Sequence, residues 1–401
     1  MFVNAFIPYK GYWSSPFCKW QGSLQNEDSV KLGAATAKKF MELRGFSPDI
    51  FDGIVYGSTI PQRWWFYDSP HVATLLGNSN ISGPRIAQAC ATSTVSVNYA
   101  ACCIEMNSHK NVLVVASDRM SNGPNLLWPN PAGPGGKPEF ESWVMDGFGW
   151  DPTAETSPAG TAENVAKKYG FTREESDAMA VSRYNKYTDA LKNDREFQKR
   201  YMIPVEVKLS KKKSITIEAD EGITPCTAEG LALLKTQPDC ILTFGAQTHP
   251  ADGNAGMIVT SKERAQELSA DANIAIRIVA YGYARADKGH MPEAPTPASK
   301  LALENAGIKV ADLAAVKTHN PFAVNDLAMA KLMGIDDAIF NNYGSSLIFG
   351  HPQGPTTMRL LVELIEELVI KGGGYGLLAG CAAGDSGAAL VIKVSGKETN
   401  Q

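Results

Sequence analysis

One order of elements occurs twice in this chain, once in each half. A turn with Cys90 precedes a helix-like run at residues 91–107, which contains neither Gly nor Pro, and an apolar strand follows. Far along the chain, a strand-like run ends in a turn with His351, before a helix-like run at 356–370 and another strand. Open α/β folds place reactive side chains at the carboxyl ends of their central strands. The repeat therefore predicts an α/β protein in which each of two related halves contributes a reactive side chain.

Cys90 is predicted to lie at a helix N-terminus, capped by the Ser and Thr residues that follow it. Unpaired backbone N–H groups and the positive end of the helix dipole favour a thiolate at such a place, so Cys90 is a candidate nucleophile. Free cysteines are often simply buried, and packing among small residues is the alternative role. A nucleophile needs a base, and His351 is the candidate because its turn holds the equivalent place in the second half.

Composition narrows the class of protein. The chain has 401 residues, 44% of them hydrophobic, which suffices for a large core and two or three domains. A net charge of −4 gives no basic surface for nucleic acid, and the basic run from Lys211 to Lys213 is interpreted as a solvated turn between strands. The seven cysteines form no C-x-x-C pair, and no apolar run is long enough to span a bilayer. We therefore expect a reducing, cytoplasmic setting.

Four segments resemble the motifs of thiolases, in the family's order and over nearly the whole chain. Cys90 with its flanks resembles the nucleophile motif, and His319-Asn-Pro-Phe-Ala323 resembles the Asn-Glu-Ala-Phe segment or its His-containing variant. Gly350-His351-Pro352 and Cys381 with Gly384 resemble the other two. The resemblance implies the α/β thiolase fold, in which two similar βαβαβαββ halves form a five-layered α-β-α-β-α core with an inserted loop domain.

The resemblance also divides the chain into three parts. The N-terminal half takes residues 1–118 plus 245–270, the loop domain takes 119–244, and the C-terminal half takes 271–401. In thiolases the loop domain covers the active site and carries most of the coenzyme A contacts.

A mechanism follows from the same resemblance. His351 accepts the proton of Cys90, whose sulfur attacks the keto carbonyl of a 3-oxoacyl-CoA and keeps the acyl group. Cys381 protonates the departing CoA enolate and then activates free CoA, which is a substrate; no tightly bound cofactor and no metal is implied. One oxyanion site combines His351 with the side chain at position 319, here His319, and the other uses the backbone N–H groups of Cys90 and Ala383. A purely structural role is the alternative for His319.

Departures from common thiolases predict a different acyl pocket. Thr248 and His249 replace a Ser-Gly pair at the thioester end of CoA. All seven Trp residues lie in the first 150 residues, and aromatic side chains suit a bulky or aryl acyl group, with ordinary packing as the alternative for each. The further candidates for contact with substrate or CoA are Trp64, Trp65, Phe322 and Arg63.

Together with the His-Asn-Pro-Phe variant, this pattern resembles the thiolase subunit of benzoylsuccinyl-CoA thiolase from anaerobic toluene degradation, which forms benzoyl-CoA and succinyl-CoA. That resemblance implies a homodimer with a small zinc-binding OB-fold partner subunit, and a basic residue that meets the succinyl carboxylate; Arg63, Arg119 and Arg285 are candidates. One alternative is a general 3-ketoacyl-CoA thiolase or acetyl-CoA acetyltransferase. Another, from a different class, is a non-catalytic acyl-CoA-binding scaffold subunit. A decarboxylating ketosynthase shares the fold but has no use for Cys381.

Overall fold

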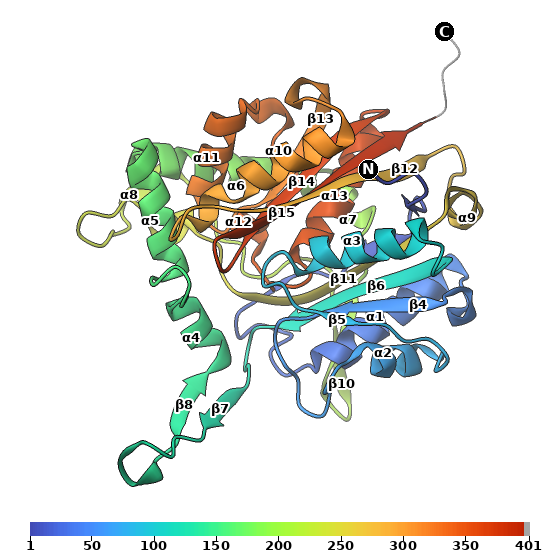
Figure 1. Ribbon diagram of the computed structural model, residues 1–401, viewed down its shortest axis with the longest axis horizontal. Helices are drawn as coiled ribbons and strands as arrows, with labels where there is room; N and C mark the ends of the chain where they lie inside the picture. The colour runs from blue at the N-terminus through green and yellow to red at the C-terminus, as the bar shows by residue number, and fades with distance from the viewer. Residues whose placement is uncertain (397–401) are drawn as a thin grey trace.

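The structure, a computed structural model, describes residues 1–396 and contains two α/β halves (Figure 1). The predicted C-terminal half is described as far as residue 396, and its last residues, 397–401, lie outside the described residues. The first half contains β1 (Phe6–Ile7), β2 (Tyr12–Ser14), β3 (Cys18–Lys19), α1 (Ser29–Arg44), β4 (Gly53–Gly57), α2 (Ser69–Leu76), β5 (Arg85–Ile86), α3 (Thr92–Glu105), β6 (Asn111–Arg119), β11 (Ala251–Thr260) and α9 (Lys262–Leu268).

The second half repeats the strand pairing of the first. In the first half β4 runs parallel to β6, and β6 pairs antiparallel with β11. In the second, β13 runs parallel to β14, and β14 pairs antiparallel with β15. The short strand β1 pairs with both β11 and β12 and joins the two sheets. The second half contains β12 (Ala275–Arg285), α10 (Pro295–Ala306), β13 (Leu313–His319), α11 (Ala323–Met333), α12 (Ser346–Phe349), α13 (Thr356–Ile370), β14 (Gly373–Ala382) and β15 (Ser386–Ser395).

Helices α3 and α13 form the middle layer, between the sheets of the two halves. They contact one another, and each also contacts strands of both sheets. Every residue from Thr356 to Leu368 is buried, as expected for a helix that is covered on all sides. Helices α1 and α2 cover the outer face of the first sheet, and α10 covers the second. The predicted five-layered fold is therefore confirmed, and the middle layer brings the amino ends of α3 and α13 together.

The start of α3 differs from the sequence-based prediction. The N-cap residue is Ala91, which makes no side-chain capping hydrogen bond, and the Thr94 N–H of the first turn donates to the Thr357 hydroxyl at 3.2 Å. The Thr92 hydroxyl instead donates to the Ala89 carbonyl and accepts from the Gln88 N–H, because the turn before the helix has its own polar groups to satisfy. The predicted Ser or Thr cap was wrong, and this hydroxyl stabilises the turn that holds Cys90.

The run before His351 is a helix rather than the predicted strand. Ser346–Phe349 form the short helix α12, so His351 lies between two helices, α12 and α13. The side-chain oxygen of Asn320 accepts a hydrogen bond from the Leu347 N–H at 3.1 Å and so holds the first turn. A short buried apolar run has no periodicity that separates helix from strand, which explains the error.

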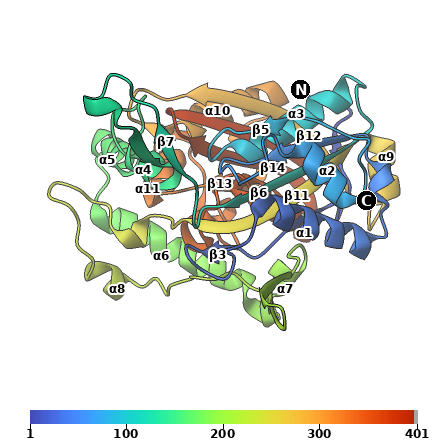
Figure 2. The ribbon, with the colours of Figure 1, turned by 90° about the horizontal axis from the view of Figure 1, so that it is seen from below.

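The inserted segment begins with an arm that projects from the body (Figure 1). Seen from below, the arm lies at the same end of the molecule as α4 and α5 (Figure 2). Its strands β7 and β8 form an antiparallel pair, and exposed apolar side chains follow the arm, including Leu127 and Phe140. The Lys211 and Lys212 pair lies in the exposed turn of the β9–β10 hairpin, as predicted. The segment contains β7 (Asn125–Trp128), β8 (Glu139–Ser142), α4 (Trp143–Gly149), α5 (Pro158–Tyr169), α6 (Arg173–Ala190), α7 (Lys192–Lys199), β9 (Val205–Ser210), β10 (Lys213–Ile217) and α8 (Ala228–Ala232).

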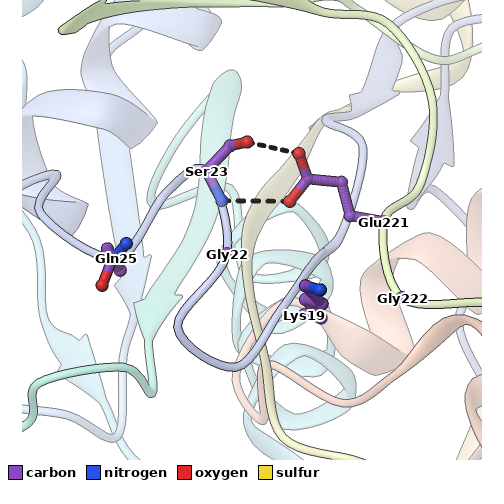
Figure 3. A pocket seen from close by; sticks show the side chains of 6 residues that line it. All are labelled: Lys19, Gly22, Ser23, Gln25, Glu221 and Gly222. Carbon is purple, nitrogen blue, oxygen red and sulfur yellow. Dashed lines mark hydrogen bonds between the residues drawn. The ribbon is translucent and has the colours of Figure 1, made fainter.

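Two adjacent carboxylates tie the inserted segment to the body. Asp220 makes a bidentate ion pair with the buried Arg359 of α13, with N–O distances of 2.6 and 2.8 Å. Glu221 accepts hydrogen bonds from the backbone N–H and the hydroxyl of Ser23, beside a surface hollow that Lys19 also lines (Figure 3). None of the predicted catalytic residues lines this hollow. Among the described residues, no helix combines the length and apolar character needed to cross a membrane.

Candidate active site

Cys90 lies in a tight turn between the edge strand β5 and helix α3. Ala89, just before it, has a left-handed backbone with φ of 44°, which a non-glycine residue adopts only where its surroundings hold it. Thr92 provides this support through hydrogen bonds of 2.8 and 2.7 Å to the two residues before Cys90. The half-buried Cys90 sulfur lies 3.1 Å from Nε2 of His351. The two halves thus bring the predicted nucleophile and base together.

His351 is fixed by contacts on its backbone and its ring. Its N–H donates to the His249 carbonyl at 2.9 Å, and its carbonyl accepts from the Ala251 N–H at 3.3 Å. On the ring, Nδ1 lies 2.7 Å from the hydroxyl of Thr356, the first residue of α13. With the Nδ1 proton donated to that hydroxyl, Nε2 presents its lone pair to the Cys90 thiol. This is the arrangement of a general base.

Burial keeps the Cys90–His351 pair uncharged in the resting protein. It raises the pKa of Cys90 to about 12, and a hydrogen bond from the residue's own backbone N–H offsets only part of that increase. Burial also lowers the pKa of His351 well below its ordinary value, and the neighbouring His319 and His249 add to the effect. The helix terminus was expected to favour the thiolate, whereas burial raises the pKa of Cys90 and favours the thiol. The Cys90 proton must therefore pass to His351 as the sulfur attacks.

His319 lies directly against His351, at the end of strand β13. The two rings stack with their centroids 4.1 Å apart. Nδ1 of His319 lies 2.8 Å from the Ser346 hydroxyl, and burial lowers the pKa of the ring to about 3. Nε2 is buried and has no hydrogen-bond partner within residues 1–396. The neutral ring therefore has one nitrogen free for a ligand.

The Ser346 hydroxyl decides which nitrogen of His319 carries the proton. It lies 3.2 Å from the side-chain oxygen of Asn320, which already accepts a hydrogen bond from the Leu347 N–H. The hydroxyl can donate either to that oxygen or to Nδ1 of His319; when it donates to Nδ1, Nε2 of His319 carries the proton. In that form Nε2–H is a donor suited to an oxyanion, as predicted for position 319.

Cys381 lies at the end of strand β14, in an apolar cluster with Phe322 and residues of helix α5. Burial raises the pKa of Cys381 well above the ordinary value, and a thiolate on Cys90 would raise it further, whereas a hydrogen bond from Asn325 opposes the increase. The Asn325 amide nitrogen lies 3.3 Å from the Cys381 sulfur. Ala382, the next residue, belongs to a small apolar cluster against which Cys90 packs. Cys381 is thus a neutral thiol near Cys90, with one donor ready to stabilise its thiolate.

Asn325 and Thr356 are the site residues that the sequence did not reveal. Asn325 is the third residue of α11, where its side-chain oxygen accepts the Phe322 N–H at 3.1 Å; this bond turns the amide nitrogen towards Cys381. Thr356 lies five residues after His351, and a predicted helix start at Thr356 would have identified it as a candidate partner of the His351 ring. The Ala383 turn is held from the inserted segment, because Asp151 accepts the Gly384 N–H at 2.7 Å.

The predicted substrate residues fall into two groups. Thr248, His249 and Phe322 lie beside the catalytic residues: Thr248 donates from its backbone to Pro321 at 2.7 Å, and His249 holds the His351 backbone. Trp64, which is 80% exposed, and Arg63 contact one another, with the guanidinium over the indole ring. Trp65 donates to Asp28, on the outer side of the first sheet, at 2.7 Å. The structure gives these three no contact with Cys90 or His351.

The three arginines that are candidates for contact with a substrate carboxylate lie in different parts of the structure. The exposed Arg285 donates to the Gly384 carbonyl at 2.9 Å, on the loop that follows Cys381. Arg119 uses its guanidinium on the carbonyls of Glu27 and Asn122. Arg285 is therefore the one that lies next to a catalytic loop.

Two models of one protein family match almost the entire chain. The family described as "Thiolase, N-terminal domain" matches residues 13–263, and "Thiolase, C-terminal domain" matches residues 272–394. A probable acetyl-CoA acetyltransferase of Escherichia coli (strain K12) is 28% identical over 385 residues, with 94% of this chain and 96% of the relative covered. A beta-ketothiolase of Cupriavidus necator is 28% identical over 381 residues, with 93% and 95% covered.

Solved structures agree with the sequence relatives. The crystal structure of the Bacillus anthracis acetyl-CoA acetyltransferase has a TM-score of 0.90 at 27% identity, with 98% of this chain and 99% of that chain covered. The human mitochondrial 3-ketoacyl-CoA thiolase has a TM-score of 0.89 at 26% identity, with the same coverage. The likeness extends over both halves and the inserted segment.

Proposed function

Because the chain belongs to the thiolase family and is an acyltransferase, we propose that it cleaves a 3-oxoacyl-CoA with CoA through an acyl-enzyme on Cys90. One observation carries this proposal: the Cys90 sulfur lies 3.1 Å from Nε2 of His351, and Cys90 packs against the cluster that contains Ala382, the residue after the second thiol, Cys381. A nucleophile, a base and a separate acid are what carbon–carbon cleavage of this kind requires.

In the first half-reaction the Cys90 proton passes to His351 while the sulfur attacks the keto carbonyl. The developing oxyanion is met by Nε2–H of His319, which is neutral and carries no competing hydrogen bond. When the carbon–carbon bond breaks, its electron pair leaves with the CoA enolate. Cys381, kept as a thiol by burial, donates the proton that the enolate carbon takes.

In the second half-reaction the Cys381 thiolate removes the proton of free CoA, whose sulfur then attacks the acyl group on Cys90. The bond between the acyl group and Cys90 breaks, and the departing Cys90 sulfur takes back the proton that His351 held. The Asn325 amide stabilises the thiolate that exists between the two steps. We assign the second oxyanion site to the backbone N–H groups of Cys90 and Ala383. The Asp151 contact with Gly384 supports this assignment, because it fixes the turn that carries Ala383.

We also propose that residues 119–244 act as a loop domain that covers the site and binds CoA. Packing of α5 in one cluster with Phe322 and Cys381 supports the covering role. The ion pair between Asp220 and Arg359 supports a fixed position for the domain over the body.

For the substrate we propose benzoylsuccinyl-CoA, which is cleaved to benzoyl-CoA and succinyl-CoA. The His319-Asn-Pro-Phe322 segment supports this assignment, and Arg285, beside the Cys381 loop, is suited to the succinyl carboxylate. The second candidate is a general 3-ketoacyl-CoA thiolase or acetyl-CoA acetyltransferase. The names of the relatives favour that candidate. The position of Trp64 favours it too, because this exposed side chain does not line an aryl pocket as expected.

Intact-protein mass spectrometry after brief incubation with benzoyl-CoA, and separately with acetyl-CoA, distinguishes these substrates. A benzoyl adduct on Cys90 that forms much faster than the acetyl adduct supports the aryl substrate. Faster acetylation supports the general thiolase. With Cys90→Ala as the control, an adduct elsewhere or no adduct from either donor would contradict the acyl-enzyme and favour a scaffold.

We further propose that the chain forms a homodimer and meets a small zinc-binding OB-fold subunit. The exposed apolar side chains on the β7–β8 arm support contact with another chain, since exposed apolar surface is stabilised when a partner buries it. Light scattering on the purified chain, with and without the candidate subunit, measures both associations. A monomer that binds no such subunit would contradict the proposal.

A further inference from the structure

We propose that Cys90, His319 and His351 together form a binding site for a thiophilic divalent cation such as Zn²⁺, which blocks the nucleophile while it is bound. Each of these residues offers one ligand atom, and the three atoms lie within 4.8 Å of one another. Among the described residues, this is the one group of three or more potential ligands with that geometry. The inference goes beyond the thiolase reaction, because it depends on these side chains and not on any acyl substrate.

The unpartnered nitrogen of His319 is the second, independent observation. The ring is fully buried, and its Nδ1 is taken by the Ser346 hydroxyl. Nε2 nevertheless has no hydrogen-bond partner in the described part of the chain. An unpaired polar atom in a buried site costs free energy, and a metal ion supplies the missing partner.

The surrounding hydroxyls prepare both rings as ligands. Histidines that bind metals generally donate their other ring N–H to a fixed acceptor, which sets the tautomer and aims the lone pair. Thr356 lies 2.7 Å from Nδ1 of His351, and Ser346 lies 2.8 Å from Nδ1 of His319. Ser346 accepts from His319 when its own proton turns to the Asn320 side-chain oxygen at 3.2 Å. One rotation of this hydroxyl therefore converts an oxyanion donor into a metal ligand.

The ligand set fits zinc in type and number. Zn²⁺ binds thiolate at about 2.3 Å and imidazole at about 2.0 Å, and a set of three protein ligands leaves a fourth position for water or a thiol. In a tetrahedral site with these bond lengths a sulfur and a nitrogen ligand lie roughly 3.5 Å apart. The Cys90 sulfur and Nε2 of His351 lie 3.1 Å apart, and all three ligand atoms lie within 4.8 Å of one another, so small side-chain adjustments suffice. On binding, the metal replaces the Cys90 proton, which leaves to solvent, and the sulfur lone pair and the His351 lone pair both become engaged. Neither attack nor proton transfer is then available until the metal is removed.

Position 319 makes the site specific to a chain with this segment. An asparagine there, as in the common Asn-Glu-Ala-Phe form, keeps an N–H donor for an oxyanion but offers no imidazole to a metal. His319→Asn is therefore the variant that separates the two properties.

The test is a Zn²⁺ titration of the full chain in competition with a chromogenic chelator, with Co²⁺ absorption as a second readout of thiolate ligation. We expect one metal per chain in the wild type, and the same affinity in the matched control Cys240→Ser, whose cysteine lies outside the site. Ser346→Ala should weaken binding roughly 10–100-fold, as removal of an outer partner of a metal-bound histidine does. Cys90→Ala and His319→Asn should lose more, and Cys90→Ala should also lose the thiolate-to-cobalt absorption.

Two further results decide the matter. Bound Zn²⁺ should protect Cys90 from iodoacetamide in the wild type, and a chelator should restore labelling. Metal binding that is unchanged in Cys90→Ala or in His319→Asn would overturn the proposal, as would a wild type that binds no Zn²⁺. Because these readouts use no acyl-CoA, a failure of the proposed thiolase reaction leaves them unaffected, and the two outcomes remain distinguishable.

Discussion

The resting charge of the catalytic pair can be tested through the pH dependence of Cys90 alkylation. An ordinary cysteine, with a pKa near 8.5, is about 3% thiolate at pH 7. With its pKa raised to about 12, Cys90 is only about one part in 10⁵ thiolate at that pH. The free protein should therefore react with iodoacetamide roughly 3,000-fold more slowly than an ordinary thiol, since the thiolate is the reactive form. The rate should rise about tenfold per pH unit through pH 9.

The assay is the alkylation rate of individual cysteines, measured by peptide mass spectrometry between pH 5.5 and 9.5. Cys240, outside the site, serves as the internal reference in each sample. Because the pKa of His351 is lowered well below its usual range, no inflection should occur near pH 6.5. A Cys90 rate that reaches a plateau above pH 6 would mean that a thiolate–imidazolium pair exists at rest. That result would refute the reasoning from desolvation.

Four other changes test separate parts of the site and its support. Cys381→Ala should leave acylation by an acyl-CoA intact but abolish carbon–carbon bond chemistry, and equal loss of both in stopped-flow and product assays would contradict its role as acid. Asn325→Ala should slow the carbon–carbon step roughly 10–100-fold and leave acylation unchanged, because it removes a hydrogen bond to a charged sulfur that is worth about 1.5–3 kcal/mol. An effect on acylation alone would count against a role for the Asn325–Cys381 contact. His319 has a folded-state pKa of about 3, below the unfolded value near 6.5, so it lowers the free energy of unfolding progressively as the pH falls from 6.5 towards 3. In urea titrations, the free energy of unfolding of His319→Asn should fall by about 2 kcal/mol less than that of the wild type between pH 7 and 5. Equal decreases in the two proteins would disprove this. Arg359→Met should cost about 3–5 kcal/mol of unfolding free energy by leaving the buried Asp220 carboxylate unpaired, and the double variant with Asp220→Asn should recover part of it; no recovery would mean that the loss comes from packing instead.

The element order and most catalytic positions could be predicted because they depend on local patterns. Residues 91–107 have no helix breaker, and the structure has α3 at Thr92–Glu105. The run before His351 was misassigned because its four helical residues, Ser346–Phe349, are fixed by a contact with Asn320 from another element. The expectation that the helix terminus favours a Cys90 thiolate was not met for a related reason. A helix N-terminus is visible in the sequence, whereas the burial that outweighs it depends on the second half of the chain.

The sequence by itself determined the thiolase family and the two-half architecture, and it singled out Cys90, His351 and Cys381 as the candidate nucleophile, base and second cysteine, because short motifs and their order specify these. Only the tertiary structure decided how these groups act. It placed His351 and His319 against Cys90, placed the Thr356 and Ser346 hydroxyls against the Nδ1 atoms of these two rings, and supplied Asn325 to Cys381. These partners lie up to 261 positions apart in the chain, and their pKa values and hydrogen bonds depend on desolvation, which exists only once both sheets close on the middle helices.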